Sequence, residues 1–198
     1  MNQTTMRIIK ADNYDEMSQI AAEIFISKIK QKPDAVLGLA TGSTPLGLYK
    51  NLIEDHQKNG TSYQQIHTVN LDEYIGLSKD NPNSYHSYMM NNLFKYLDIP
   101  QNHIHLPHGD AVDLLQECER YETIINDLGN VELQVLGIGK NGHIGFNEPG
   151  TPFSSKTHII ELKESTRQAN ARFFNHLDEV PKQAITMGIS TIMKSKEI

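Results

Sequence analysis

The segment Leu37 to Leu52, LGLATGSTPLGLYKNL, contains the unit from which the fold of this chain can be predicted. An apolar run over Ala35 to Ala40 predicts a short buried strand. Pro45 to Lys58 carries apolar residues at three- and four-residue spacing, which is typical of a helix packed on one face. The sequence therefore predicts a strand, a glycine-containing turn and a helix in direct succession.

The same alternation continues along the chain. Further strands are predicted at Arg7 to Ile9, Ile66 to Leu71, Leu133 to Ile138, Thr157 to Leu162 and Ala184 to Met187. Further helices are predicted at Tyr14 to Lys30, Ser84 to Leu97, Ala111 to Leu128 and Ser165 to Asn175. Alternating strands and helices indicate an α/β fold, here a three-layer αβα sandwich with a mainly parallel, Rossmann-like sheet. We expect one domain over residues 1–198, with Ile99 to Asp110 as a surface connection.

Composition excludes several classes of protein. With 198 residues, 38% hydrophobic and 21% charged, the chain can bury a substantial core. The net charge of -6 and the lack of a dense Lys/Arg run argue against nucleic acid as a partner. No apolar stretch approaches the roughly 20 residues that span a bilayer, and no signal-peptide core is visible. With Cys118 as the single cysteine, we expect a cytoplasmic protein.

The turn between the strand predicted at Ala35 to Ala40 and the helix that follows it has the features of an anion site. Residues 41–44 supply hydroxyls and backbone N–H groups where a helix dipole is positive, with Pro45 near the first helical position. The Walker spacing is absent, so a nucleotide P-loop is not supported. An ordinary capped helix and a phosphate site are both compatible with this segment alone.

Two carboxylates, Asp72 and Glu73, follow the strand predicted at Ile66 to Leu71. At the C-terminal end of a parallel strand, a buried carboxylate can act as a general base with a raised pKa. The alternative is a solvated turn, which is the commoner state of charged loop residues.

A glycine-rich loop, GIGKNGHIGFNEPG at Gly137 to Gly150, follows the apolar run Val131 to Leu136. It carries Asn141, His143 and Glu148 beyond a strand's carboxyl end, where open α/β sheets bind ligands. Histidine titrates near neutral pH and a glutamate can orient it, so the loop predicts acid/base chemistry.

Two other interpretations of the sequence are weaker. Gly137, Gly139 and Gly142 match GxGxxG, but prolines occupy the interval where a dinucleotide-binding helix would have to follow. The histidines at 103, 105 and 108, with Asp110, fit no standard zinc spacing. We also expect Cys118, within an amphipathic helix, to be a buried core thiol.

Together the segments LATGSTPLGLY, NLDEYIGL, GIGKNGHIGFNEPG, STRQANARFF and VPKQAITMGIST resemble the glucosamine-6-phosphate deaminase family over nearly the whole chain. The related 6-phosphogluconolactonases share the fold but typically carry Asp-Glu-Arg at 72–74 and a DGHTAS-type loop. Tyr74 and the run Ile144 to Pro149 favour the deaminase.

This resemblance implies conversion of glucosamine 6-phosphate and water to fructose 6-phosphate and ammonia. It implies that Asp72 is the enolisation base, that His143 is the ring-opening acid/base, and that Asn141 and Glu148 assist and orient His143. Some family members have Asp at position 141; an amide cannot titrate, so Asn141 can only orient or polarise by hydrogen bonding.

The resemblance also implies the binding residues. The phosphate contacts are Thr41, Gly42, Ser43, Thr44 and Arg172, and residues 165–175 resemble the family's mobile lid. No metal or organic cofactor is implied. The expected partner is a small sugar phosphate, and a homo-oligomer is an open alternative to a monomer.

The C-terminus departs from the family pattern. The chain ends at KSKEI, where residues 196–198 resemble the start of a strand, whereas the family continues with a further strand, a helix and a phosphate-binding lysine. We therefore expect a C-terminally incomplete domain. A 6-phosphogluconolactonase-like hydrolase and a non-catalytic sugar-phosphate-binding protein are the alternative functions.

Overall fold

A four-stranded parallel sheet forms the centre of the computed structural model, which describes residues 6–198 apart from the side chain of Phe173. Its order is β4-β2-β1-β5, with β1 at Val36–Leu39, β2 at His67–Asn70, β4 at Ile104–His105 and β5 at Leu133–Gln134. β1 lies in the middle because Leu37 pairs with Thr68 on one side and with Leu133 on the other. All residues of β1 are buried, as expected for a parallel strand covered on both faces.

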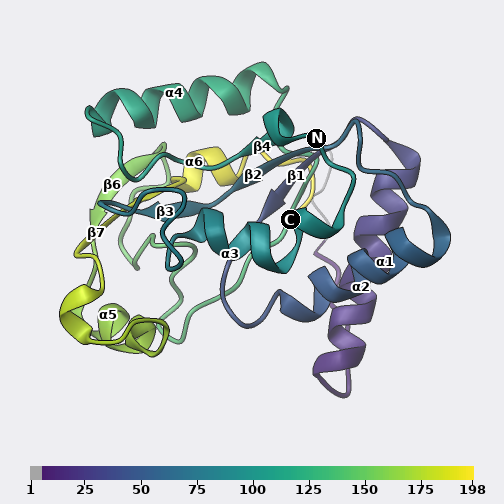
Figure 1. The fold of residues 1–198 in the computed structure, drawn as a ribbon, viewed down its shortest axis with the longest axis horizontal. Helices are drawn as coiled ribbons and strands as arrows, with labels where there is room; N and C mark the ends of the chain where they lie inside the picture. Colours follow the sequence, from purple (N-terminus) through teal and green to yellow (C-terminus); the bar gives the residue numbers. More distant parts are fainter. Residues whose placement is uncertain (1–5) are drawn as a thin grey trace.

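Helices cover both faces of this sheet (Figure 1). The helices α1 (Tyr14–Gln31), α2 (Leu46–Asn59) and α3 (Tyr85–Asn92) share one hydrophobic cluster with β1. The other face carries α4 (Leu114–Asp127) and the short α6 (Ile189–Ile192), whose buried side chains pack with those of β2. The three-layer αβα prediction is thereby confirmed.

Polar side chains determine where three of the helices begin. Asn13, Ser84 and Asp113 each accept a hydrogen bond from the backbone N–H three residues later, at 2.9 to 3.0 Å. These are typical N-caps, because the first N–H groups of a helix have no partner within the helix. The predicted helix starts at positions 14, 84 and 111 are therefore correct to within three residues.

A second, antiparallel sheet lies beside the first. Its order is β3-β7-β6, with β3 at Asp72–Tyr74, β6 at His158–Glu161 and β7 at Gln183–Thr186. β3 follows β2 after the single residue Leu71, so one stretch of chain leaves the parallel sheet and enters the antiparallel one. Asp72, the first residue of β3, lies at the junction of the two sheets.

The segment between β6 and β7 does not build a crossover helix against the sheet. It forms α5 (Glu164–Asn170), which lies away from the helix layers in Figure 1. Short 3-10 turns complete the structure at Phe94–Tyr96, Gln101–His103, Ala171–Phe173 and Leu177–Glu179. The chain therefore returns antiparallel, which the strand predictions for residues 157–162 and 184–187 did not specify.

Three sequence predictions need correction. Residues 7–9 are in no strand, and their apolar side chains are not part of the core, because Ile8 is 80% and Ile9 41% exposed. The strand predicted at 133–138 ends at Gln134, and the chain beyond it is loop. The predicted connection over 99–110 contains β4, which pairs with Thr68 and Val69 of β2. At the other edge, Glu197 forms an isolated parallel bridge with Leu133.

Candidate active site

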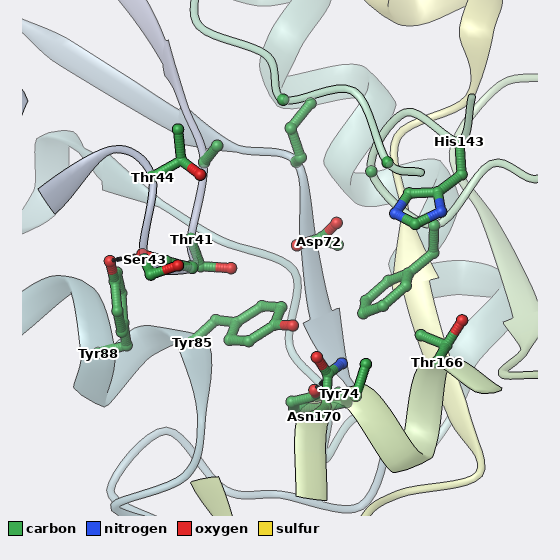
Figure 2. Close-up of a pocket in the computed structure, with 18 of the residues that line it drawn as sticks. Thr41, Ser43, Thr44, Asp72, Tyr74, Tyr85, Tyr88, His143, Thr166 and Asn170 are labelled. Atoms are coloured by element: carbon green, nitrogen blue, oxygen red, sulfur yellow. Dashed lines mark hydrogen bonds between the residues drawn. The ribbon is translucent and has the colours of Figure 1, made fainter. Parts of the chain in front are cut away.

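A cavity of about 870 Å³ opens beyond the carboxyl ends of β1 and β2 (Figure 2). Its wall is formed by the turn after β1, the start of β3, the beginning of α3, the glycine-rich loop after β5, and α5 with the turn that follows it. Of the residues predicted for the site, the cavity is lined by Thr41, Gly42, Ser43, Thr44, Asp72, Asn141, His143 and Arg172. Glu148 is the exception and lies behind Asn141, with which it is hydrogen-bonded.

The turn at residues 41–44 is shaped by Gly42, whose φ of 102° lies in the left-handed region that favours glycine. The following helix α2 has Pro45 as its N-cap, and no side chain caps it. The side-chain cap of an ordinary capped helix is therefore absent at this helix start. Tyr14 instead uses its hydroxyl to accept a hydrogen bond from the Gly47 N–H, at 2.8 Å. Figure 2 shows Ser43 and Thr44 on the same side of the cavity as Thr41.

Asp72 lies between this turn and His143 in Figure 2. It is only 7% exposed, although it lines the cavity. Burial, and then the negative charge of Glu73, raise the pKa of Asp72 to about 8. A carboxylate with a pKa near neutrality is suited to taking and returning a proton, because both protonation states are accessible.

The neighbouring Glu73 points away from the cavity and serves the fold. Its carboxylate accepts hydrogen bonds from the backbone N–H groups of Tyr74, Tyr85 and His86, at 2.8 to 2.9 Å. Burial raises the pKa of Glu73 to about 7 against the opposing effect of these bonds. The two adjacent acids thus have different positions, one at the site and one holding the start of α3.

His143 belongs to a hydrogen-bonded chain of side chains. Its Nδ1 lies 2.7 Å from Oδ1 of Asn141, and Asn141 Nδ2 donates to Glu148 Oε2 at 2.7 Å. Because a carboxylate only accepts, the amide nitrogen must face Glu148 and the amide oxygen must face His143. Nδ1 of His143 is then the donor, and the neutral ring carries its lone pair on Nε2.

Glu148 is partly buried, and burial alone would raise its pKa. Hydrogen bonds from Lys163 and Asn141, with the charges of Lys163 and His143, hold the pKa of Glu148 below its ordinary value instead. Lys163 Nζ lies 3.0 Å from Glu148 Oε2. The sequence motifs did not point to Lys163, because no spacing rule connects it to a loop fifteen residues earlier.

Small residues and one buried amide bring this loop close to β3 and β7. Asn147 is 2% exposed and donates to the carbonyls of Ile144 and Met187, at 2.9 and 2.7 Å. A Cβ at Gly145 would come within 3.3 Å of Oδ2 of Asp72. The loop therefore places His143 and Asp72 on the same cavity although they are far apart in sequence.

Aromatic side chains form another part of the cavity wall that the sequence analysis did not identify. Tyr74 contacts Tyr85, Phe146 and Phe174, with ring centroids 4.7 to 6.0 Å apart. Asn170 of α5 donates to the Tyr74 hydroxyl at 2.8 Å, which attaches α5 to β3. Arg172 follows α5, is exposed and lines the cavity.

The remaining candidates lie elsewhere. His103 and His105 stack with His67, whereas His108 is exposed, and no metal-holding group of His, Cys, Asp or Glu occurs within residues 6–198. Cys118 is buried in α4, and burial raises its thiol pKa to about 11. The GxGxxG glycines are followed by loop rather than helix, which argues against a dinucleotide site.

Across the described chain, no helix is long and apolar enough to cross a membrane.

Comparison with known proteins identifies the family. Residues 10–198 match the family described as glucosamine-6-phosphate isomerases/6-phosphogluconolactonase. A glucosamine-6-phosphate deaminase of Geobacillus sp. (strain WCH70) is 63% identical over 98% of this chain and 77% of its own length.

Solved structures separate the two enzymes of this family. One described as a monomeric glucosamine-6-phosphate deaminase superposes with a TM-score of 0.95 at 56% identity, over 96% of this chain and 79% of its own. A 6-phosphogluconolactonase from Trypanosoma brucei has a TM-score of 0.75 at 17% identity, over 97% of this chain and 80% of its own. At that identity the lactonase shows a shared fold alone. By sequence and by structure, the chain belongs to the glucosamine-6-phosphate deaminase family.

Proposed function

We propose that this protein converts glucosamine 6-phosphate and water into fructose 6-phosphate and ammonia. The observation that carries this proposal is the arrangement around one cavity of a buried carboxylate with a raised pKa, Asp72, and an oriented imidazole, His143. It occurs in a chain 63% identical to a glucosamine-6-phosphate deaminase.

The phosphate would bind at the turn of residues 41–44. Backbone N–H groups near the start of α2 and the nearby hydroxyls suit an anion. Arg172, which also lines the cavity, would supply paired N–H donors to the phosphate oxygens. Anchoring the phosphate on C6 positions the sugar in the cavity, so that C1 and C2 would be held near Asp72 and His143.

Ring opening needs a proton moved from the C1 hydroxyl to the ring oxygen. Nε2 of His143 carries the lone pair in the neutral ring, because Nδ1 donates to Asn141. His143 would therefore take the C1 hydroxyl proton and deliver a proton to the ring oxygen, which breaks the bond between C1 and that oxygen.

Isomerisation then needs a base beside C2. Asp72 would take the C2 proton, giving a cis-enediol-like intermediate with the amine on C2, and would return a proton to C1. Reprotonation at C1 leaves an iminium at C2, which water attacks. Ammonia departs from C2, and the C2 ketone of fructose 6-phosphate remains.

A direct assay tests the proposal. Purified protein should release ammonia and fructose 6-phosphate in equal amounts from glucosamine 6-phosphate, and Asp72→Asn is the matched control for contaminating activity. Hydrolysis of 6-phosphogluconolactone without ammonia release would support the lactonase instead. Binding of glucosamine 6-phosphate without product would support a sugar-phosphate sensor.

We further propose that the protein acts as a monomer. This rests on the structure at 56% identity, which is described as that of a monomeric enzyme. Light scattering after size exclusion should give the mass of one chain, and a larger stable mass would contradict the proposal.

A further inference from the structure

Lys163 connects two parts of the site without lining the cavity. Its ammonium group lies 3.0 Å from Oε2 of Glu148, on the glycine-rich loop. Its backbone carbonyl accepts hydrogen bonds from the N–H groups of Thr166 and Arg167, both at 2.9 Å, and so begins α5. One residue thus links the wall formed by α5 to the carboxylate behind His143.

Lys163 contacts the same carboxylate oxygen of Glu148 that holds Asn141, the hydrogen-bond partner of His143. Oε2 of Glu148 accepts from Lys163 Nζ and also from Asn141 Nδ2, at 3.0 and 2.7 Å. The charged and titratable groups that act on Glu148 are Lys163 and His143. Lys163 therefore places a positive charge beside this carboxylate and holds it in position by a hydrogen bond.

The orientation of Asn141 depends on that carboxylate. An amide can present either its oxygen or its NH₂ group to a neighbour. Ionised Glu148, which can only accept, draws the NH₂ group away from His143, and the backbone N–H of His143, 3.3 Å from Asn141 Oδ1, favours the same orientation. If Asn141 turned over, its NH₂ group would face Nδ1, and the neutral ring would carry its proton on Nε2. His143 would then have no lone pair facing away from Asn141, and could not begin ring opening as a base.

We propose that Lys163 is a positioning residue which, by holding the Glu148 carboxylate, keeps Asn141 turned so that His143 stays in the Nδ1–H tautomer. This rests on the proposed function for its catalytic consequence, but the tautomer itself can be measured without substrate. Lys163 is 56% exposed at its side chain, so the expected effect is modest.

The test compares Lys163→Met, Lys163→Arg and wild type. With Lys163→Met, ¹⁵N chemical shifts at alkaline pH should show His143 as a mixture of tautomers, where wild type shows Nδ1–H. The ¹³C carboxyl titration of Glu148 should move up by about half a pH unit, because an exposed ion pair is lost. Turnover of closed-ring substrate should fall ~2- to 5-fold with KM unchanged, since Lys163 does not line the cavity.

Lys163→Arg should restore all three readouts, because it keeps the charge. Lys182→Met is the matched control: Lys182 is exposed, and its carbonyl accepts from Leu162, the residue just before Lys163. In a Glu148→Gln background, Lys163→Met should have no further effect, because its action runs through Glu148.

An unchanged tautomer in Lys163→Met, additive effects of the two substitutions, or failure of Lys163→Arg to restore the signals would each overturn the proposal. If wild type releases no ammonia, the proposed function fails, whereas the two NMR readouts still decide the role of Lys163.

Discussion

Two carboxylates near this cavity have opposite electrostatic surroundings. Asp72 at the start of β3 is buried and next to Glu73, and its pKa is raised to about 8. Glu148 on the loop after β5 is hydrogen-bonded by Lys163 and Asn141, and its pKa is held low. The same functional group is thus adapted to exchange a proton in one place and to remain charged in the other.

This difference in pKa indicates different roles for Asp72 and Glu148. Pairs of titratable groups whose surroundings separate their pKa values commonly mark an acid/base pair and its supporting groups. Asp72 lines the cavity directly, whereas Glu148 does not line it and is hydrogen-bonded to Asn141, which does.

Asp72→Asn removes the proton acceptor and should have the largest effect. Turnover should fall ~10²- to 10⁴-fold, the usual range for loss of a general base, while phosphate affinity and the fold are kept. Steady-state kinetics and inorganic phosphate binding measure both. More than about half of wild-type activity in a folded variant would remove Asp72 from the mechanism.

His143→Gln removes the proposed ring-opening acid/base. It should therefore affect the closed-ring form of the substrate more than the open-chain form. Closed-ring glucosamine 6-phosphate should react about 10²-fold more slowly, the low end for acid/base catalysis, because sugar rings also open in solution. The small pre-opened fraction should react nearly as in wild type. Rapid mixing resolves the two phases, and an equal loss in both would contradict a ring-opening role.

Gly139→Ala should displace His143 without changing its chemistry. A Cβ at Gly139 would lie 2.2 Å from the imidazole, so the ring must move. Misplacing a catalytic group by about 1 Å can cost up to ~10²-fold, and we expect ~10-fold in kcat. Gly137→Ala is the control, because a Cβ there meets nothing within 4 Å. Equal losses in both variants would show that the loop, not the imidazole, is sensitive.

The dependence of stability on pH tests the surroundings of Asp72. Since the folded-state pKa of about 8 exceeds the ordinary value of 3.8, the folded state holds a proton that the unfolded state has released. Wild type should therefore lose stability relative to Asp72→Asn as pH rises from about 4 to about 8, and the difference should be constant above that. Urea unfolding at several pH values measures it; a difference independent of pH would show that Asp72 is not shielded from water.

Local pattern was enough to predict most of the fold. Helices α1 and α2 and strands β1 and β2 lie within one or two residues of their predicted bounds, because each has a clear apolar period. β3 and β4 have three and two residues, too few to show any period. The direction of β6 and β7 was also beyond pattern analysis, since it depends on the chain returning through α5 without a crossover helix.

For the site, the motifs indicated candidate residues with side chains suited to acid/base chemistry, and the family resemblance supplied their expected roles. The structure brings the turn at 41–44, Asp72, His143 and Arg172 to one cavity. The assigned roles stay predictions until the variants above are measured. Lys163, Asn147 and the aromatic wall around Tyr74 could not be predicted, because each acts through a partner distant in sequence.

By itself, the sequence determined the layered α/β fold, the family, and the order of the polar segments at the ends of the strands. Those properties follow from periodicity and from motifs, which are local in the chain. Only the tertiary structure decided that Asp72 would be buried and that Glu148 would lie beside Lys163 and stay charged. Burial and charge pairing are properties of the space around a side chain, and that space is built by residues from several distant segments.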